Sequence, residues 1–200
     1  PTSAFKDVAL CMLPHLVTTA LKKHGIDDEI IILTATSGDT GKAALAGFKD
    51  VENTKIMVFY PEEGVSAVQK RQMETQGGNN VCVASIAGNF DDAQSCVKEI
   101  FTDLALADKM KRNHQQFSSA NSINVGRLMP QVVYYFKAYA DLVKRKVIAL
   151  KEPVNFAVPT GNFGNILAGY LAKQMGLPVA KFICASNENN ILTDFMKTGV

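Results

Sequence analysis

The chain has 200 residues, enough to bury a sizeable core, and its 47% hydrophobic and 20% charged residues are ordinary for a globular protein. Its 21 basic and 19 acidic residues are scattered and leave a net charge of +2, so the sequence shows no electrostatic footprint for nucleic acid or an acidic membrane. No apolar run approaches the length of a membrane span. Composition therefore points to an ordinary globular protein, with no sign of a nucleic-acid or membrane partner.

The four cysteines are far apart and form no CxxC pair. This spacing argues against a zinc site or a disulfide framework, and it favours a reducing compartment such as the cytoplasm. Cys82 and Cys184 fall in apolar, strand-like runs, where we expect them to be buried as small hydrophobes. The three histidines show no HExxH pattern, and no GxSxG elbow exists, so metal-dependent and serine hydrolysis are poorly supported.

The first seven residues, PTSAFKD, place a lysine before a helix. Apolar residues recur at helical spacing from Val8 to Leu21, and the pattern ends at basic residues and Gly25. Lys6 is therefore predicted at the start of a helix, where the helix dipole disfavours positive charge and eases loss of its proton. A neutral amine is a nucleophile. Because the chain begins inside this segment without methionine, we expect a fragment of a longer protein.

Strands and helices alternate along the rest of the chain. The predicted strands are 30–36, 55–60, 81–86, 116–118, 154–158 and 181–185, and the predicted helices are 42–48, 66–76, 90–108 with Asn89 as cap, 127–146 and 165–175. This order predicts an α/β fold with a parallel sheet between helix layers, a three-layer αβα arrangement. Ligands of such sheets bind beyond the carboxyl ends of strands, where three polar loops are expected.

The first polar loop, SGDTG, follows the strand 30–36 and precedes a helix. Its glycines and hydroxyl residues could let backbone N–H groups converge on an anion. A Walker loop would need glycine at Thr36 and Ser or Thr at Ala43, so Lys42 is interpreted as solvated. The alternative is an ordinary capped turn with Asp39 or Thr40 as N-cap. The loop consists of Ser37, Gly38, Asp39, Thr40 and Gly41.

The other two loops are also candidates for binding an anion. The loop 161–165 lies between a strand and a helix and has the composition of a phosphate cradle, but it lacks GxGxxG spacing, and ordinary turn chemistry is an equal alternative. The segment 118–127 is rich in amides and hydroxyls and ends in Arg127, whose fork suits a phosphate or a carboxylate. A position on a helix surface is the alternative for Arg127.

Taken jointly, four motifs resemble those of the threonine synthase family: PTxAFKD, SGDTG, NSINxGR and GNFGN, in that order. The resemblance runs from Pro1 to at least Asn190. Threonine synthases are pyridoxal-phosphate (PLP) enzymes that share the fold type II architecture of the tryptophan synthase β subunit. The resemblance therefore implies PLP as cofactor, with Lys6 as the residue that forms the Schiff base.

The resemblance also implies roles for the loops. Ser37 to Gly41 would grip the substrate carboxylate, and the group Ser122, Asn124 and Arg127 would bind the substrate phosphate. The implied reaction converts O-phospho-L-homoserine and water to L-threonine and phosphate, with Lys6 as the proton shuttle. The cofactor-phosphate loop would consist of Gly161, Asn162, Phe163, Gly164 and Asn165.

The resemblance also implies that the chain contributes to two lobes. Residues 30–125 would form a small mobile lobe, and residues 1–29 and 126–200 would belong to a large PLP lobe whose missing partners leave apolar surface exposed, so that the chain associates. A serine or threonine dehydratase, or a cysteine synthase, is the alternative within enzymes. A threonine synthase-like protein without activity is the alternative outside them.

Overall fold

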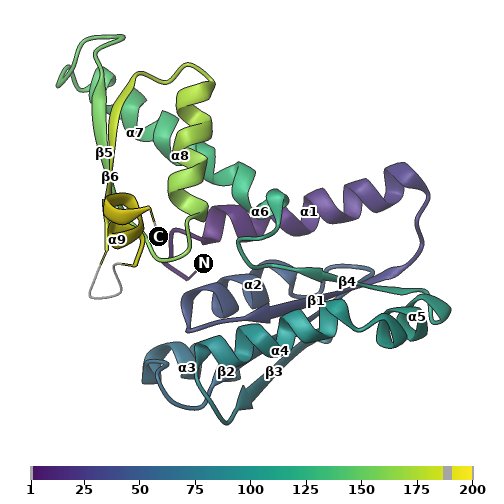
Figure 1. Cartoon of the computed structure of the whole chain (residues 1–200). Helices are drawn as coiled ribbons and strands as arrows, with labels where there is room; N and C mark the ends of the chain where they lie inside the picture. Colours follow the sequence, from purple (N-terminus) through teal and green to yellow (C-terminus); the bar gives the residue numbers. More distant parts are fainter. Residues whose placement is uncertain (1, 187–190, 200) are drawn as a thin grey trace. The chain divides into compact units, whose positions relative to one another are not determined.

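The computed structural model describes residues 2–186 and 191–199, and these divide into two compact units, residues 1–130 and 131–200 (Figure 1). The assignment of residues 30–125 to a small lobe, and of the flanking segments to a large one, stays a prediction. In both units parallel strands pack with helices, which confirms the α/β class.

A four-stranded parallel sheet forms the centre of the first unit. Its strands follow the predicted apolar runs, and each ends within two residues of its predicted end. The strand order is β3-β2-β1-β4, so the most apolar strand, β1, has a neighbour on each side. The strands are β1 (Glu29–Ala35), β2 (Thr54–Pro61), β3 (Val81–Ile86) and β4 (Gln115–Ser119).

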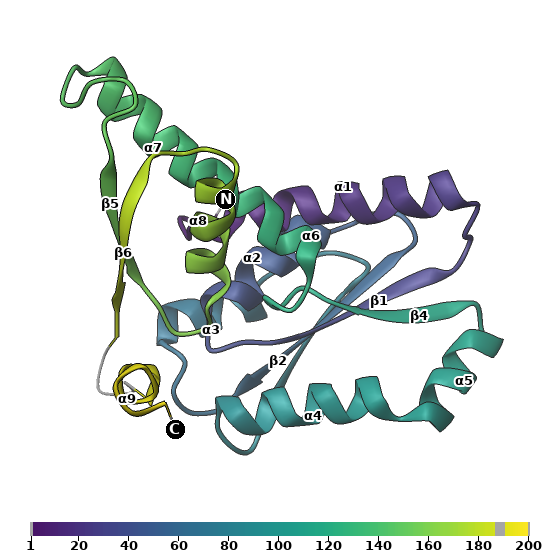
Figure 2. The same cartoon turned by 45° about the horizontal axis from the view of Figure 1, so that its top comes forward.

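Helices cover both faces of this sheet, so the first unit has three layers (Figure 2). On one face, α1 (Asp7–His24), α2 (Asp39–Phe48) and α3 (Ala67–Glu74) enclose a core that includes Ile30 and Ile32. On the other face, α4 (Phe90–Thr102) packs over Leu33 and Ala35, and α5 (Leu104–Arg112) follows it along β4. The alternation of β1 side chains between two cores explains why its sequence is apolar throughout.

The close crossing of α1 and α2 depends on a glycine. A Cβ atom on Gly47 would lie 2.2 Å from the carbonyl oxygen of Leu10, so only glycine fits there without a shift. Pro14, four residues after Leu10, is buried and has no N–H. It therefore cannot donate the usual helical hydrogen bond to the Leu10 carbonyl. The backbone of α1 therefore approaches α2 at the turn that follows Lys6.

Two predicted helices are each divided in the structure. The predicted helix 90–108 breaks at Asp103, whose carboxylate accepts from the Leu106 N–H and caps α5. The predicted helix 127–146 becomes the short α6 (Val125–Leu128), a 3-10 turn over 129–131 and α7 (Val132–Lys144). Pro130 explains this second break, because proline removes a donor and its ring disfavours the preceding helical turn. Asn89 caps α4 with a capping box, as predicted.

The second unit pairs β5 (Val154–Pro159) with β6 (Val179–Ala185) in parallel. Its helices are α7, α8 (Gly164–Gln174) and α9 (Ile191–Thr198). An aromatic cluster joins Tyr135 of α7 to Phe156 and Phe182 of the strands. A Cβ atom on Gly169 of α8 would lie 2.6 Å from the Tyr135 ring, so this glycine makes room for the cluster.

Several apolar or small side chains are exposed. Cys82 and Cys184 are exposed, so the prediction that they are buried is wrong; β3 is an edge strand and β6 belongs to a two-stranded sheet, so each lacks a neighbour on one side within the described residues. An apolar stripe on α1 and most apolar residues of α9 are also exposed, as expected; association of the chain stays a prediction. No helix of residues 2–186 and 191–199 is long and apolar enough to cross a membrane.

Candidate active site

The candidate site lies where the chain changes direction within the four-stranded sheet. From β1 the chain moves outward through β2 to β3, and it then returns through α4 and α5 to β4 on the other side of β1. The loops after β1 and β4 therefore flank a topological switch point, the usual place for ligands in open α/β sheets. These are the predicted loop 37–41 and segment 118–127.

Two asparagines brace the loop after β4. The Asn121 side chain accepts from the Ala35 N–H at 3.2 Å and donates to the Ala35 carbonyl at 2.8 Å, so it extends the pairing of β1 and β4 beyond Ser119. Asn124 donates to the Ser119 carbonyl and accepts from the Gly126 N–H as the cap of α6. Both ends of its side-chain amide therefore make hydrogen bonds within the loop. Contact of Asn124, or of the half-buried Ser122, with a phosphate stays a prediction.

The loop after β1 is organised by a threonine that the sequence analysis did not select. The buried Thr36 hydroxyl accepts from the N–H groups of Gly38 and Gly41, each at 2.9 Å. Gly38 adopts φ 143°, a backbone conformation that favours glycine. Helix α2 then begins at Asp39 with Gly38 at the N-cap position, so neither Asp39 nor Thr40 caps it and the capped-turn alternative is wrong.

The loop leaves donors available at the start of α2. Within the part of the chain that the structure describes, the N–H groups of Ser37, Asp39 and Thr40 have no hydrogen-bond acceptor. Backbone N–H groups at the start of a helix attract anions through their partial positive charge. The N–H groups of Gly38 and Gly41 are already engaged by Thr36, and binding of an anion by the other three stays a prediction. Lys42 is half-buried and donates to the Gln76 side chain.

Lys6 stands immediately before α1, as predicted, and reaches the same loop. Its Nζ lies 3.5 Å from Asp39 Oδ2 and 4.8 Å from the centre of the Phe5 ring, and its side chain is 19% exposed. Burial lowers the pKa of Lys6, the nearby Arg127 charge lowers it further, and Asp39 partly offsets both. The sequence analysis predicted a lowered pKa for Lys6 from the helix dipole; the pKa is lowered, but burial is the leading cause.

Arg127 completes the cluster from α6. It is 5% exposed, so the alternative of a helix-surface arginine is wrong. Its guanidinium donates to the Ala120 carbonyl at 2.8 Å and approaches the Thr40 hydroxyl at 3.5 Å. Burial lowers its pKa to about 10, so it keeps its charge at neutral pH. Residues from three predicted motifs, Lys6, Asp39 and Arg127, thus meet at one edge of the sheet.

The loop 161–165 belongs to the second unit and leads into α8. Asn165 is held in place: its carbonyl and its side-chain oxygen both accept from the Tyr135 hydroxyl, at 2.8 and 3.0 Å, and its amide nitrogen donates to Gln131. The Gly164 N–H donates to the Asn162 carbonyl. Among the described residues, the N–H groups of Asn162 and Phe163 have no acceptor, and the role of this turn as a phosphate cradle stays a prediction.

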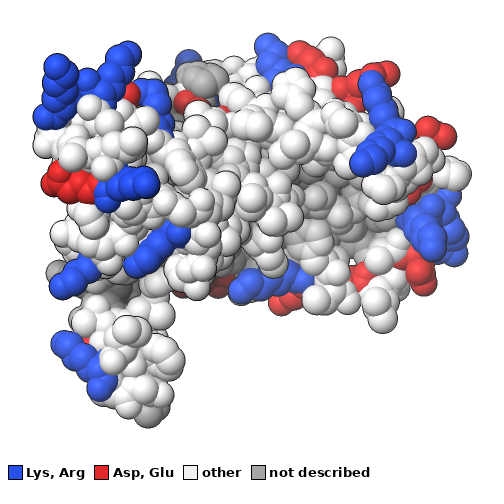
Figure 3. Space-filling view, turned by 90° about the horizontal axis from the view of Figure 1, so that it is seen from above, with Lys and Arg blue, Asp and Glu red and all other residues white. Residues whose placement is uncertain are grey.

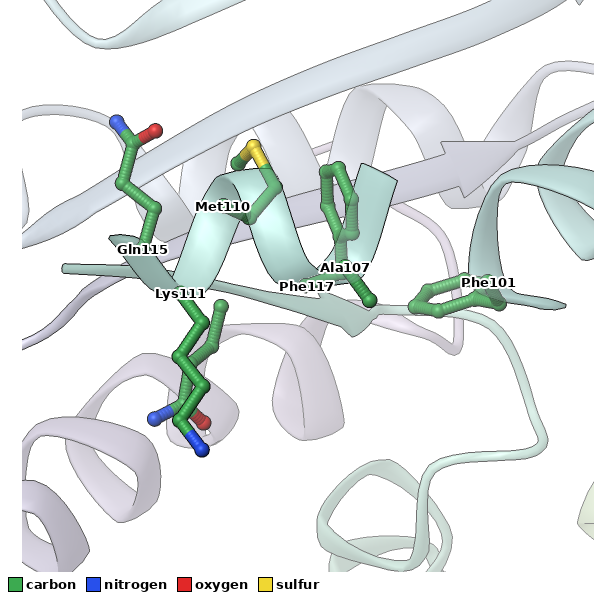
Figure 4. A pocket seen from close by; sticks show the side chains of 7 residues that line it. Phe101, Ala107, Met110, Lys111, Gln115 and Phe117 are labelled. Carbon is green, nitrogen blue, oxygen red and sulfur yellow. The ribbon is translucent and has the colours of Figure 1, made fainter. Parts of the chain in front are cut away.

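Two further surface features lie outside the predicted motifs. A hollow of about 430 Å³ between α5 and β4 is lined by Phe101, Met110 and Phe117 among others, and it contains none of the predicted site residues (Figure 4). On the face shown in Figure 3, basic and acidic side chains are interspersed. Within residues 2–186 and 191–199, no cluster of His, Cys, Asp and Glu could hold a metal ion.

Sequence comparison identifies the family. The model of the family described as "Pyridoxal-phosphate dependent enzyme" matches residues 1–200. The chain belongs to this family. Its cofactor is therefore pyridoxal phosphate, which agrees with the expectation drawn from the motifs.

Its relatives include threonine synthases and threonine synthase-like proteins. The chain is 46% identical over 196 residues to threonine synthase of Pseudomonas aeruginosa, covering 98% of this chain and 39% of that protein. It is 45% identical over 205 residues to threonine synthase-like 1 of Homo sapiens, covering all of this chain and 27% of that protein.

A solved structure supports the same kinship. The PLP-bound threonine synthase of Brucella melitensis superposes with a TM-score of 0.82 at 46% identity, covering all of this chain and 40% of that one. The type II fold of this chain is thereby confirmed. The chain spans less than half the length of each relative compared.

Proposed function

We propose that this chain provides the catalytic lysine and the substrate loops of a threonine synthase, which converts O-phospho-L-homoserine and water to L-threonine and phosphate. The observation that carries the proposal is the cluster of Lys6, Asp39 and Arg127 at the switch point of the first unit. It combines an amine of lowered pKa with a buried arginine that suits a phosphate. Relatives named threonine synthase at 46% identity support the substrate.

The residues present fit PLP. The cofactor needs an amine that can react with its aldehyde, and Lys6 is a mostly buried amine whose pKa is lowered by burial. It also needs donors for its phosphate, and the turn that begins α8 presents N–H groups held by the Asn165 and Tyr135 contacts. Residues 161–165 would hold the phosphate, and Lys6 would hold the aldehyde carbon.

PLP supplies an electron sink that makes the protons beside the amino group of an amino acid removable. In this chain Lys6 Nζ would accept and return those protons, since burial keeps more of the amine neutral. The free N–H groups of Ser37, Asp39 and Thr40 would orient the substrate carboxylate. Arg127 would bind the substrate phosphate and select against unphosphorylated homoserine. The small and large lobes proposed from the motifs would close and exclude water.

Borohydride trapping tests the assignment of Lys6. PLP is added to the chain, the complex is reduced with borohydride, and the labelled peptide is mapped by mass spectrometry. We expect the label on Lys6, and no specific label in Lys6→Ala. Lys42→Ala is the matched control, because Lys42 is also half-buried and near the loop 37–41 yet contacts Gln76. Label on other lysines at the same level would refute the assignment.

The competing functions are separated by product analysis. The second candidate is a threonine synthase-like protein without this activity, the alternative drawn from the motifs; the chain is also 45% identical to threonine synthase-like 1 of Homo sapiens. The test measures phosphate released from O-phospho-L-homoserine by the longest native polypeptide that contains this chain. Keto acid from serine or threonine without phosphate release would instead indicate a dehydratase.

The cytoplasm is the proposed location, because all four cysteines are free thiols.

A further inference from the structure

Gln69 of α3 belongs to none of the motifs, yet its side chain contacts the candidate site. We propose that Gln69 is a positioning residue that holds Asp39 against Lys6. The contacts of Gln69 do not depend on the proposed function. The role that we give them, control of the base strength of Lys6, rests on it. The contacts on both sides of the Gln69 amide carry the inference.

The contacts form a continuous chain within the first unit. The Ser66 hydroxyl, which caps α3, donates to Gln69 Oε1 at 3.0 Å. Gln69 Nε2 donates to Asp39 Oδ1, and the other oxygen of Asp39 lies 3.5 Å from Lys6 Nζ. Because Ser66 engages the amide oxygen, the amide nitrogen faces Asp39. The orientation of the Gln69 amide is thus set from the α3 side.

The loop after β1 is shaped to receive this amide. A Cβ atom on Gly38 would lie 2.4 Å from Gln69 Oε1 and 2.5 Å from its Cδ, so the glycine leaves the space that the amide occupies. Gly38 therefore serves two purposes, its positive φ and this close approach. An amide fitted against glycine backbone and bonded at both ends is held more firmly than a solvated glutamine.

The contact with Lys6 does not by itself hold the Asp39 carboxylate in place. Its side chain is 46% exposed, and an exposed carboxylate gains little from a lysine 3.5 Å away, so water competes for it. The charged groups that face Lys6 are Asp39 from α2 and Arg127 from α6, and they act on its pKa in opposite directions. If Asp39 turned into solvent, burial and Arg127 would act without this offset. A larger share of Lys6 would then be neutral at a given pH.

The experiment measures the reactivity of Lys6 without cofactor or substrate. The full chain is labelled with a trace of isotopic acetic anhydride between pH 6 and 10, and the modification of each lysine is followed by mass spectrometry. In Gln69→Met we expect Lys6 to be labelled about two- to fivefold faster at pH values below its pKa, because the contribution of Asp39 is lost. Gln69→Asn, whose amide is too short to reach Asp39, should show the same rise if the Met variant fails to fold.

Two controls make the test specific. Gln76→Met removes the amide that accepts from Lys42, so Lys42 labelling should change while Lys6 labelling does not. In Asp39→Asn the rate at Lys6 should already be raised, and adding Gln69→Met should raise it no further, since both act through one carboxylate. Unchanged or slower labelling of Lys6 in both Gln69 variants, or an equal effect of Gln69→Met on top of Asp39→Asn, would overturn the proposal. Borohydride trapping at Lys6 decides the proposed function separately.

Discussion

The crossing of α1 and α2 at Gly47 can be tested with one added methyl group. In Gly47→Ala the new Cβ would lie 2.2 Å from the Leu10 carbonyl oxygen, while real contacts of this kind are essentially never below 3.0 Å. The helices must separate by roughly 0.8 Å, and overpacking of this kind costs ~1–3 kcal/mol. Alanine recovers up to ~1 kcal/mol of helix propensity. The expected net loss in the free energy of unfolding is ~1–2 kcal/mol.

Urea unfolding followed by far-ultraviolet circular dichroism measures this loss. With a slope of ~2 kcal/mol per molar urea, the midpoint of the first unit should fall by ~0.5–1 M. Gly77→Ala is the matched control, because no atom lies within 4 Å of its added Cβ and its φ is not positive, so its free energy of unfolding should stay within ~0.5 kcal/mol of that of the native chain. A Gly47→Ala midpoint equal to or above the native one would refute the close-crossing argument.

The remaining predictions concern one residue from each unit. Tyr135→Phe removes the donor to both Asn165 acceptors and should cost ~1–2 kcal/mol, measured as faster amide hydrogen exchange at the start of α8. Burial raises the Tyr135 pKa to about 12, so its stabilisation is full below its unfolded pKa of ~10 and is lost as pH rises toward 12; a wild-type stability that stays flat across this window would contradict it. Arg127→Met should weaken binding of inorganic phosphate about tenfold or more, and Arg127→Lys should not restore it, because one ammonium cannot reproduce the fork. With an Arg127 pKa of about 10, native phosphate binding should persist to pH 9 in calorimetric titrations and decline above pH 10.

Local patterns in the sequence were sufficient for the elements and for the composition of the site. The β-branched run 30–36 became β1, Gly25 closed α1 in a left-handed conformation, and Lys6 preceded a helix, because these depend on periodicity and capping within a few residues. Where local signals competed, the predictions failed. Asp103 and Pro130 each divided a helix that apolar periodicity alone had joined.

Contacts between distant segments could not be predicted, because they depend on the order of strands in the sheet. Placing β4 beside β1 brings Asn121 to Ala35 and Arg127 to Thr40, which are more than eighty residues apart in the sequence. The use of the Thr36 hydroxyl by Gly38 and Gly41, and the reach of Gln69 to Asp39, follow from the shape of the loop after β1.

The sequence by itself determined which residues carry the chemistry: an amine at a helix start, an arginine, and loops rich in backbone donors. These are properties of residue type and local conformation. Only the tertiary structure decided which groups face one another and which are taken out of water. Burial, the leading cause of the lowered pKa of Lys6 and of Arg127, arises from packing among α1, α2 and α6. Solvation of a charge depends on its neighbours in space, and no local pattern records them.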